Sequence, residues 1–175
     1  MKLEALEVLK NRRSIRKYKS EQVSQEDLTA VLEAGTYAAT GKGTQSPLIV
    51  AVQNPQAIEV LNRLNAEILG APGSLPYYGA PTIVFVFASP KVTTPFEDAL
   101  SVGTNILNAA YAVGLGSCWV NRSRQMFETE EGKAMMKAWG IPEDCFCAIS
   151  ISLGYADCEH PEARPRKADY YRIIP

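Results

Sequence analysis

The pattern of apolar and polar residues predicts a chain in which helices and strands alternate. Apolar side chains recur every three or four positions, the helical period, in five stretches: residues 3–9, 24–38, 54–69, 96–113 and 128–139. Short and largely apolar runs predict four strands: residues 48–52, 82–88, 116–121 and 146–153. Such an alternation fits a doubly wound parallel sheet or a mixed α+β sheet, and periodicity alone does not choose between them.

Helix start and stop signals agree with several of these bounds. Ser24 followed by Asp27 resembles a capping box, and Asn54 before Pro55 is a typical helix start. Gly114, directly after the fourth helical stretch, is a typical C-terminal cap. These signals support four core strands with helices between them.

One helical stretch is unusually apolar. Residues 96–113 are rich in Ala and Leu and carry almost no charge, so we expect this helix to be buried on nearly all sides. A helix this apolar does not suit the solvent-exposed surface of a 175-residue monomer. The pattern therefore favours a homodimer.

Length and composition predict one domain covering residues 1–175, since 46% hydrophobic residues suffice for a single core. The chain has no apolar run long enough for a membrane span, and its start lacks the apolar stretch of a signal peptide. We therefore expect a cytoplasmic protein without membrane association. Four cysteines without CxxC spacing and a single histidine predict reduced thiols and no metal site.

Positive charge gathers near both ends of a chain whose net charge is only −1. Residues 12–19 hold five cations and Ser14, and a second basic group, residues 164–167, lies in a polar, proline-bearing segment that we expect to form an extended arm over a surface. Arginines donate paired hydrogen bonds to phosphate or carboxylate oxygens. If the two groups converge, they form a phosphate site built from both ends of the chain.

The basic cluster at residues 12–19 has three interpretations. It is a solvated basic turn, a nucleic-acid contact, or a site for a small phosphorylated ligand. An isoelectric point near 5.9 and the lack of a broad basic stripe weigh against nucleic acid. A small phosphorylated ligand fits better.

Several common catalytic and nucleotide motifs are missing from the sequence. The loop at residues 40–47 lacks the order of a P-loop and precedes a strand, and no GxGxxG follows the first strand. With one histidine and no nucleophile elbow, a Ser/His/Asp site is improbable. A phosphate site in a chain with so few catalytic side chains indicates that a cofactor supplies the chemistry.

The run Arg12-Arg13-Ser14-Ile15-Arg16-Lys17-Tyr18 after a short helix resembles the N-terminal signature of the nitroreductase family, in which it binds FMN. Residues 45–50 resemble the family's loop-to-strand block, residues 98–110 its long core helix, and residues 114–119 its flavin-facing turn. Residues 164–167 are similar to the basic pair that the family uses on the phosphate. These blocks span nearly the whole chain.

The resemblance implies an α+β fold with a mostly antiparallel sheet flanked by helices, a homodimer, and FMN at the dimer interface. It also implies that the 5′-phosphate is held by four residues: Arg12, Ser14, Arg164 and Arg166. Arg16 would reach the N1/C2-carbonyl edge of the isoalloxazine, where a cation stabilises negative charge, and Arg13 is also placed at the cofactor. Beside the ring, near N5, the resemblance puts the end of the third strand: Cys118, Trp119, Val120 and Asn121.

The loop before the first strand departs from the family pattern. Many members have N-x-Q-P-W where this chain has Thr44-Gln45-Ser46-Pro47-Leu48, so we assign the contact to the flavin pyrimidine edge to Gln45. The chain is also shorter than the long branch of the family. We expect the missing length to come from the segment that covers the active site, which would leave the flavin face more open.

The resemblance implies an FMN-dependent oxidoreductase that uses NADH or NADPH to reduce a nitroaromatic, a quinone or a related acceptor by a ping-pong mechanism. No side chain is expected to be a catalytic acid or base, because the flavin carries the chemistry. Two alternatives stay open: a non-catalytic flavin-binding or redox-sensing protein, and a module that binds polyanions. The sequence does not choose between NADH and NADPH, nor does it name the acceptor.

Overall fold

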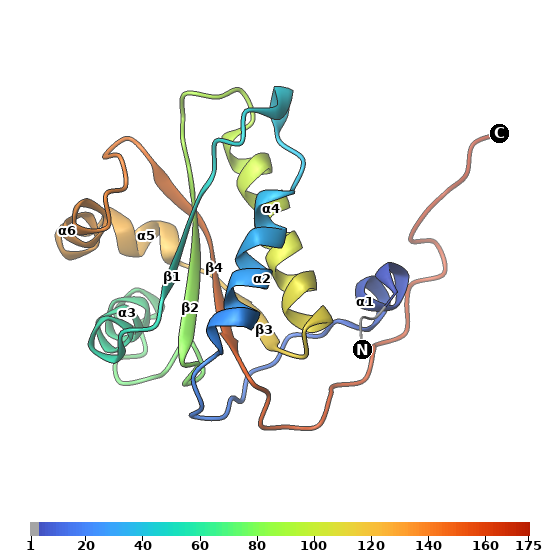
Figure 1. The fold of residues 1–175 in the computed structure, drawn as a ribbon, viewed down its shortest axis with the longest axis horizontal. Helices are drawn as coiled ribbons and strands as arrows, with labels where there is room; N and C mark the ends of the chain where they lie inside the picture. The colour runs from blue at the N-terminus through green and yellow to red at the C-terminus, as the bar shows by residue number, and fades with distance from the viewer. Residues whose placement is uncertain (1–3) are drawn as a thin grey trace.

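A four-stranded antiparallel sheet lies at the centre of the computed structural model, which describes residues 4–175 (Figure 1). Its strands are β1 (Leu48–Val52), β2 (Thr82–Ala88), β3 (Gly116–Val120) and β4 (Phe146–Gly154). They lie in the order β1-β2-β4-β3, and each neighbouring pair is antiparallel. This confirms the expected α+β fold and excludes the parallel alternative.

Helices surround the sheet at bounds close to those predicted: α1 (Ala5–Asn11), α2 (Gln25–Thr36), α3 (Pro55–Leu69), α4 (Pro95–Ala112), α5 (Ser123–Glu128) and α6 (Glu130–Ala138). The predicted caps form, since Ser24 accepts from the Asp27 amide and Asn54 from the Ala57 amide. Position 3 of the first predicted stretch lies outside the described residues. Helix α5 was not predicted, and the loop before β1 contains a short 3₁₀ turn, Gly41–Gly43.

Two apolar layers form the core, one on each face of the sheet. Helices α2 and α4 cover one face, while α3, α5 and α6 cover the other (Figure 1). Side chains of β2 alternate between the two layers, with Val84 and Val86 on the α4 side and Ile83 and Phe85 on the other. Every residue of β2 is buried, because this strand lies inside the sheet with a covered face on each side.

The segment after α1 runs alongside β3 and continues the sheet on that side. Ser14 pairs with Ser117 in a parallel bridge, and the Ile15 amide donates to the Ser117 carbonyl at 3.0 Å. A Cβ on Gly116 would lie 2.9 Å from the Ile15 Cβ, so only glycine lets this segment approach so closely. The basic cluster is thereby fixed beside β3.

The prediction that residues 96–113 are buried on nearly all sides is wrong for the single chain. Helix α4 buries seven residues against the sheet and α2, but Phe96 remains 44% exposed and Thr104 is also exposed. No further layer formed by residues 4–175 covers the face of α4 on which these exposed residues lie. Among the described residues, no helix has both the length and the hydrophobicity needed to cross a membrane.

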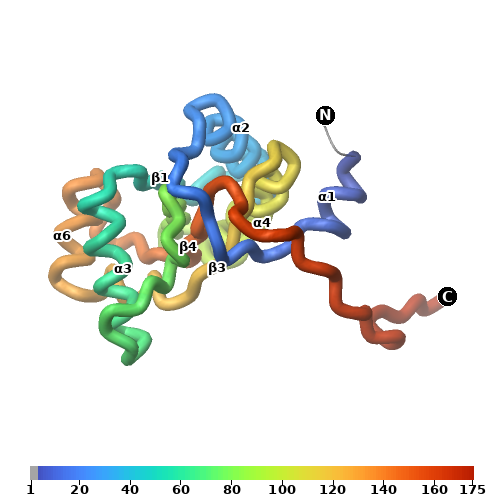
Figure 2. The backbone as a smooth tube through the Cα atoms, turned by 90° about the horizontal axis from the view of Figure 1, so that it is seen from below, coloured from blue at the N-terminus to red at the C-terminus, as the bar shows by residue number. Residues whose placement is uncertain are grey.

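The C-terminal segment is extended, as predicted, and only its first part lies against the rest of the chain. It first passes α1, where His160 Nε2 lies 2.8 Å from the Asn11 carbonyl. The remainder then projects away from the sheet and helices (Figures 1 and 2). Four large apolar side chains near its end are 75–84% exposed: Tyr170, Tyr171, Ile173 and Ile174.

Candidate functional site

The two basic groups predicted from the sequence meet in one hollow of about 380 Å³. One wall is formed by the segment that directly follows α1 and runs alongside β3, and the other wall is formed by the C-terminal arm. The residues that line it are Arg12, Arg13, Ser14, Arg16, Pro161, Glu162, Arg164 and Arg166. Segments some 150 positions apart in the sequence therefore form a single concave surface.

The hollow carries positive charge that the described residues do not neutralise. Of the residues lining it, five are arginines and one, Glu162, is acidic. Among residues 4–175, none of these arginines lies within ion-pair distance of a carboxylate. Burial and the adjacent positive charge of Arg13 lower the pKa of Arg12. A bound anion would offset both effects, so the site fits a phosphate group.

Arg13 differs from the other arginines of the hollow in what it contacts. Its Nη1 donates to the Lys10 carbonyl at 2.8 Å and to the Arg12 carbonyl at 2.7 Å. These are carbonyls at the C-terminal end of α1, which lack helical partners. Part of the Arg13 guanidinium is thus used to close α1, although its buried Nε has no partner in the described part of the chain.

Arg16 points to an aromatic ring that the sequence analysis did not single out. Its Cζ lies 5.9 Å from the centroid of the Tyr78 ring, within the range of a cation–π contact. The pKa of Arg16 is raised, chiefly by the neighbouring Tyr78 side chain. Tyr78 lies in the loop between α3 and β2, 62 positions away from Arg16 in sequence.

The end of β3 exposes some predicted site residues and buries others. The side chains of Cys118 and Val120 are in the core, whereas Trp119 is 36% exposed and Asn121 is exposed. Cys118 and Val120 can therefore meet a ligand only through their main-chain atoms. Gly116, which lies in this strand, makes room for Ile15.

A buried polar network holds the peptide that follows β3. Asn65 of α3, fully buried, donates to the Asn121 carbonyl at 3.0 Å and accepts from Arg122 Nε at 2.9 Å. On the same side, Ser150 Oγ donates to the Val120 carbonyl at 2.8 Å. These hydrogen bonds hold the carbonyl groups of Val120 and Asn121 in place. They thereby also fix the direction of the neighbouring amide groups. Asn65 was not predicted from the sequence, since nothing in a helical pattern marks such a role.

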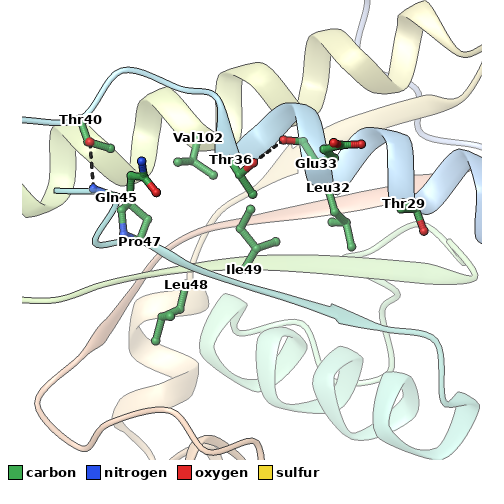
Figure 3. A pocket seen from close by; sticks show the side chains of 10 residues that line it. All are labelled: Thr29, Leu32, Glu33, Thr36, Thr40, Gln45, Pro47, Leu48, Ile49 and Val102. Carbon is green, nitrogen blue, oxygen red and sulfur yellow. Dashed lines mark hydrogen bonds between the residues drawn. The ribbon is translucent and has the colours of Figure 1, made fainter. Parts of the chain in front are cut away.

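Gln45 is not brought to the basic hollow within one chain. It lines a separate pocket of about 470 Å³ between α2, β1 and α4 (Figure 3). Its backbone N–H donates to Thr40 Oγ1 at 3.0 Å, and its φ of 50° lies in the left-handed region. Gln45 is thus separated from the predicted site residues that line the basic hollow.

The sequence profile of the nitroreductase family matches residues 9–155. A protein of Archaeoglobus fulgidus, provisionally named NADH dehydrogenase/NAD(P)H nitroreductase, is 30% identical over 158 residues, which cover 87% of this chain and 85% of that protein. A crystal structure of a nitroreductase with bound FMN from Bacteroides fragilis superposes with a TM-score of 0.90 at 31% identity, over 99% of this chain and 100% of that one.

A nitroreductase with bound FMN from Desulfitobacterium hafniense has the same fold, with a TM-score of 0.87 at 24% identity over 99% of this chain and 100% of that chain. The basic cluster at residues 12–16 and the turn at residues 114–119 both fall inside the matched range. The sequence match, the structural match and the geometry of the hollow agree. The chain belongs to the nitroreductase family.

Proposed function

We propose that this protein is an FMN-dependent oxidoreductase that uses NADH or NADPH to reduce a nitroaromatic, a quinone or a related acceptor. The observation that carries the proposal is the convergence of Arg12, Ser14, Arg164 and Arg166 on one hollow, where the described residues form no ion pair with these arginines. Relatives that share the fold bind FMN or are named for NAD(P)H-dependent reduction. In the proposal, each half-reaction uses the same site in turn, which gives ping-pong kinetics.

Different residues of the hollow would bind different parts of the cofactor. Arg12, Ser14, Arg164 and Arg166 would bind the 5′-phosphate through charge-assisted hydrogen bonds. Arg16 would lie toward the ring, where its positive charge stabilises negative charge near N1 and the C2 carbonyl. When bound, FMN supplies the hydride chemistry that no side chain of the site provides.

The end of β3 would provide the surface beside the ring. Asn121 and the main chain of Cys118 and Val120 would face it, with Trp119 exposed next to them. Asn65 and Ser150 hold the carbonyls of this segment, so its amides keep one orientation as ligands enter and leave. Pre-organised donors of this kind stabilise developing charge without having to reorient.

We include a homodimer in the proposal, with each copy one domain of residues 1–175. Two surfaces support it: the open face of α4 around Phe96, and the arm, whose terminal tyrosines and isoleucines are 75–84% exposed. Exposed apolar groups of this size usually mark an interface. Gln45 lies in a separate pocket between α2, β1 and α4, so a second copy would be needed to bring it near a flavin.

Flavin uptake and turnover test the proposal in two steps. Protein stripped of ligand is titrated with FMN, and bound FMN is then mixed anaerobically with NADH or NADPH. We expect tight uptake and bleaching of the flavin absorbance. Uptake without bleaching would favour a flavin-binding sensor, and failure to take up FMN, with salt-sensitive binding of a polyanion, would favour the polyanion module.

The double variant R12A/R164A removes two phosphate ligands, and R124A is its matched control. Arg124 is an exposed arginine that pairs with Glu128 on α5, away from the hollow. We expect the double variant to lose FMN and the control to keep it. Equal affinity in both variants would show that the hollow is not the phosphate site.

A further inference from the structure

Tyr78 occupies a backbone position that disfavours its own side chain. The Ala80 amide donates to the Tyr77 carbonyl at 3.1 Å, which closes a tight turn with Tyr78 and Gly79 at its centre. Their φ angles are 59° and 70°, both left-handed, as in a type I′ turn. The first central position of such a turn favours Asn, Asp or Gly, and a bulky aromatic residue there is an outlier. Outliers of this kind indicate a functional reason.

The turn is fixed to the core by the residue immediately before it. Tyr77 is fully buried, and its hydroxyl lies 3.3 Å from both Ser150 Oγ and Asn65 Nδ2. Its amide donates to the buried Asn62 side chain at 3.2 Å. Tyr77 is anchored on α3 and β4. The backbone position of the neighbouring Tyr78, from which its side chain extends, is therefore restricted.

The Tyr78 ring, 37% exposed, lies against the Arg16 guanidinium at 5.9 Å. Among residues 4–175, Arg16 has no carboxylate partner that would otherwise orient it. A long, flexible side chain without a partner loses its orientation, and an aromatic face restricts it at modest cost. The strained turn therefore supplies the only restraint on Arg16 seen in the described part of the chain.

We propose that Tyr78 is a positioning residue for Arg16, and that the Tyr77–Gly79 turn keeps its unfavourable residue for that purpose. The inference rests on the proposed function, because Arg16 is assigned to the electron-accepting ring. It adds a residue from the loop before β2, far in sequence from the basic cluster, to the determinants of cofactor reactivity. Tyr78 would act on the rate of reduction rather than on FMN affinity.

The substitution Tyr78→Asn separates this role from a structural one. Asn suits the turn, so the variant should unfold at the same or a higher denaturant concentration than the wild type. Reduction of bound FMN by NADH should slow about two- to fivefold, the ratio that corresponds to one partly exposed cation–π contact, while FMN affinity is unchanged. Tyr78→Phe keeps the ring and should retain most of the rate. Tyr37→Asn, at a tyrosine that is 80% exposed, is the matched control.

Two further measurements decide whether Tyr78 acts through Arg16. In FMN-free protein, the Nε–Hε NMR signal of Arg16 should carry a ring-current shift that Tyr78→Asn removes and Tyr78→Phe preserves. In the Arg16→Ala background, Tyr78→Asn should have no additional effect on the rate. An unshifted Arg16 signal in the wild type, or the same slowing with and without Arg16, would overturn the proposal. Wild-type protein that fails to bind FMN refutes the proposed function instead, and the NMR signal then tests the Tyr78–Arg16 contact alone.

Discussion

The substitution Asn65→Leu should be among the most destabilising single changes in this chain. Asn65 is fully buried and joins three partners: the Asn121 carbonyl at 3.0 Å, Arg122 Nε at 2.9 Å and the Tyr77 hydroxyl at 3.3 Å. Leu has the same branched arrangement of heavy atoms and is somewhat larger, so the change removes hydrogen bonds without opening a cavity. Its cost therefore reports on the network itself.

The expected magnitude follows from these contacts. Two neutral hydrogen bonds contribute about 1 kcal/mol each, and the bond to a guanidinium contributes about 1.5–3 kcal/mol. Exposure of Arg122 to water recovers part of the last value, so we expect a loss of about 3–4 kcal/mol in the free energy of unfolding. That is a large part of the roughly 5–15 kcal/mol available to a domain, and it lowers the melting temperature by about 6–16 °C.

Urea unfolding of the FMN-free protein, followed by circular dichroism, measures this loss. Asn105→Leu is the matched control, because the half-buried Asn105 makes one bond, to the Ala34 carbonyl at 3.1 Å. That variant should lose only about 1 kcal/mol. If both variants lost the same free energy, the network around Asn65 would not stabilise the end of β3 as described.

Three other outcomes follow from the site, the arm and the core. Arg12→Ala should weaken FMN binding about tenfold to a hundredfold, as expected for a lost charge-assisted hydrogen bond. Arg16→Ala should slow flavin reduction more than it weakens FMN binding. Equal effects on binding and reduction in both variants would contradict separate roles. Charge on the arm, in the double variant I173E/I174E, should convert a dimer into a species near 19.1 kDa in sedimentation, and a wild type already at that mass would exclude the dimer. Burial raises the pKa of Cys147 from 9.0 to about 12, so between these two pH values only the unfolded chain loses the thiol proton. The free energy of unfolding therefore falls as the pH rises through this range, by up to about 1.4 kcal/mol per pH unit. Cys147→Ala should show a shallower fall in urea titrations from pH 9 upward, and an identical slope would contradict the assignment.

The local elements were predictable because each has a strong local cause. Strand β2 is recognisable from six apolar residues in a row, 83–88, and α3 from Asn54 and Pro55 at its start. The strand order was not predictable, since periodicity does not encode which strands pair. Helix α5 was missed because its six residues are largely polar and follow Arg122, whose left-handed φ of 76° breaks the pattern.

The candidate site shows the same division between local and distant causes. Arg12, Ser14, Arg16, Arg164 and Arg166 were predictable from charge and motif, and the structure brings them together in one hollow. The supporting residues were not predictable. Asn65 and Tyr78 matter through neighbours more than 50 positions away, and in sequence they read as an ordinary helix residue and an ordinary loop residue.

The central claim is that the hollow between residues 12–16 and the arm binds FMN in a form that NADH or NADPH reduces. Anaerobic stopped-flow mixing of the FMN-loaded protein with each nucleotide tests it most directly. The account predicts loss of the flavin absorbance within one turnover and its return when a quinone or nitroaromatic acceptor is added. Bound flavin that neither nucleotide bleaches would contradict the proposed activity, and protein that takes up no FMN would contradict the site itself.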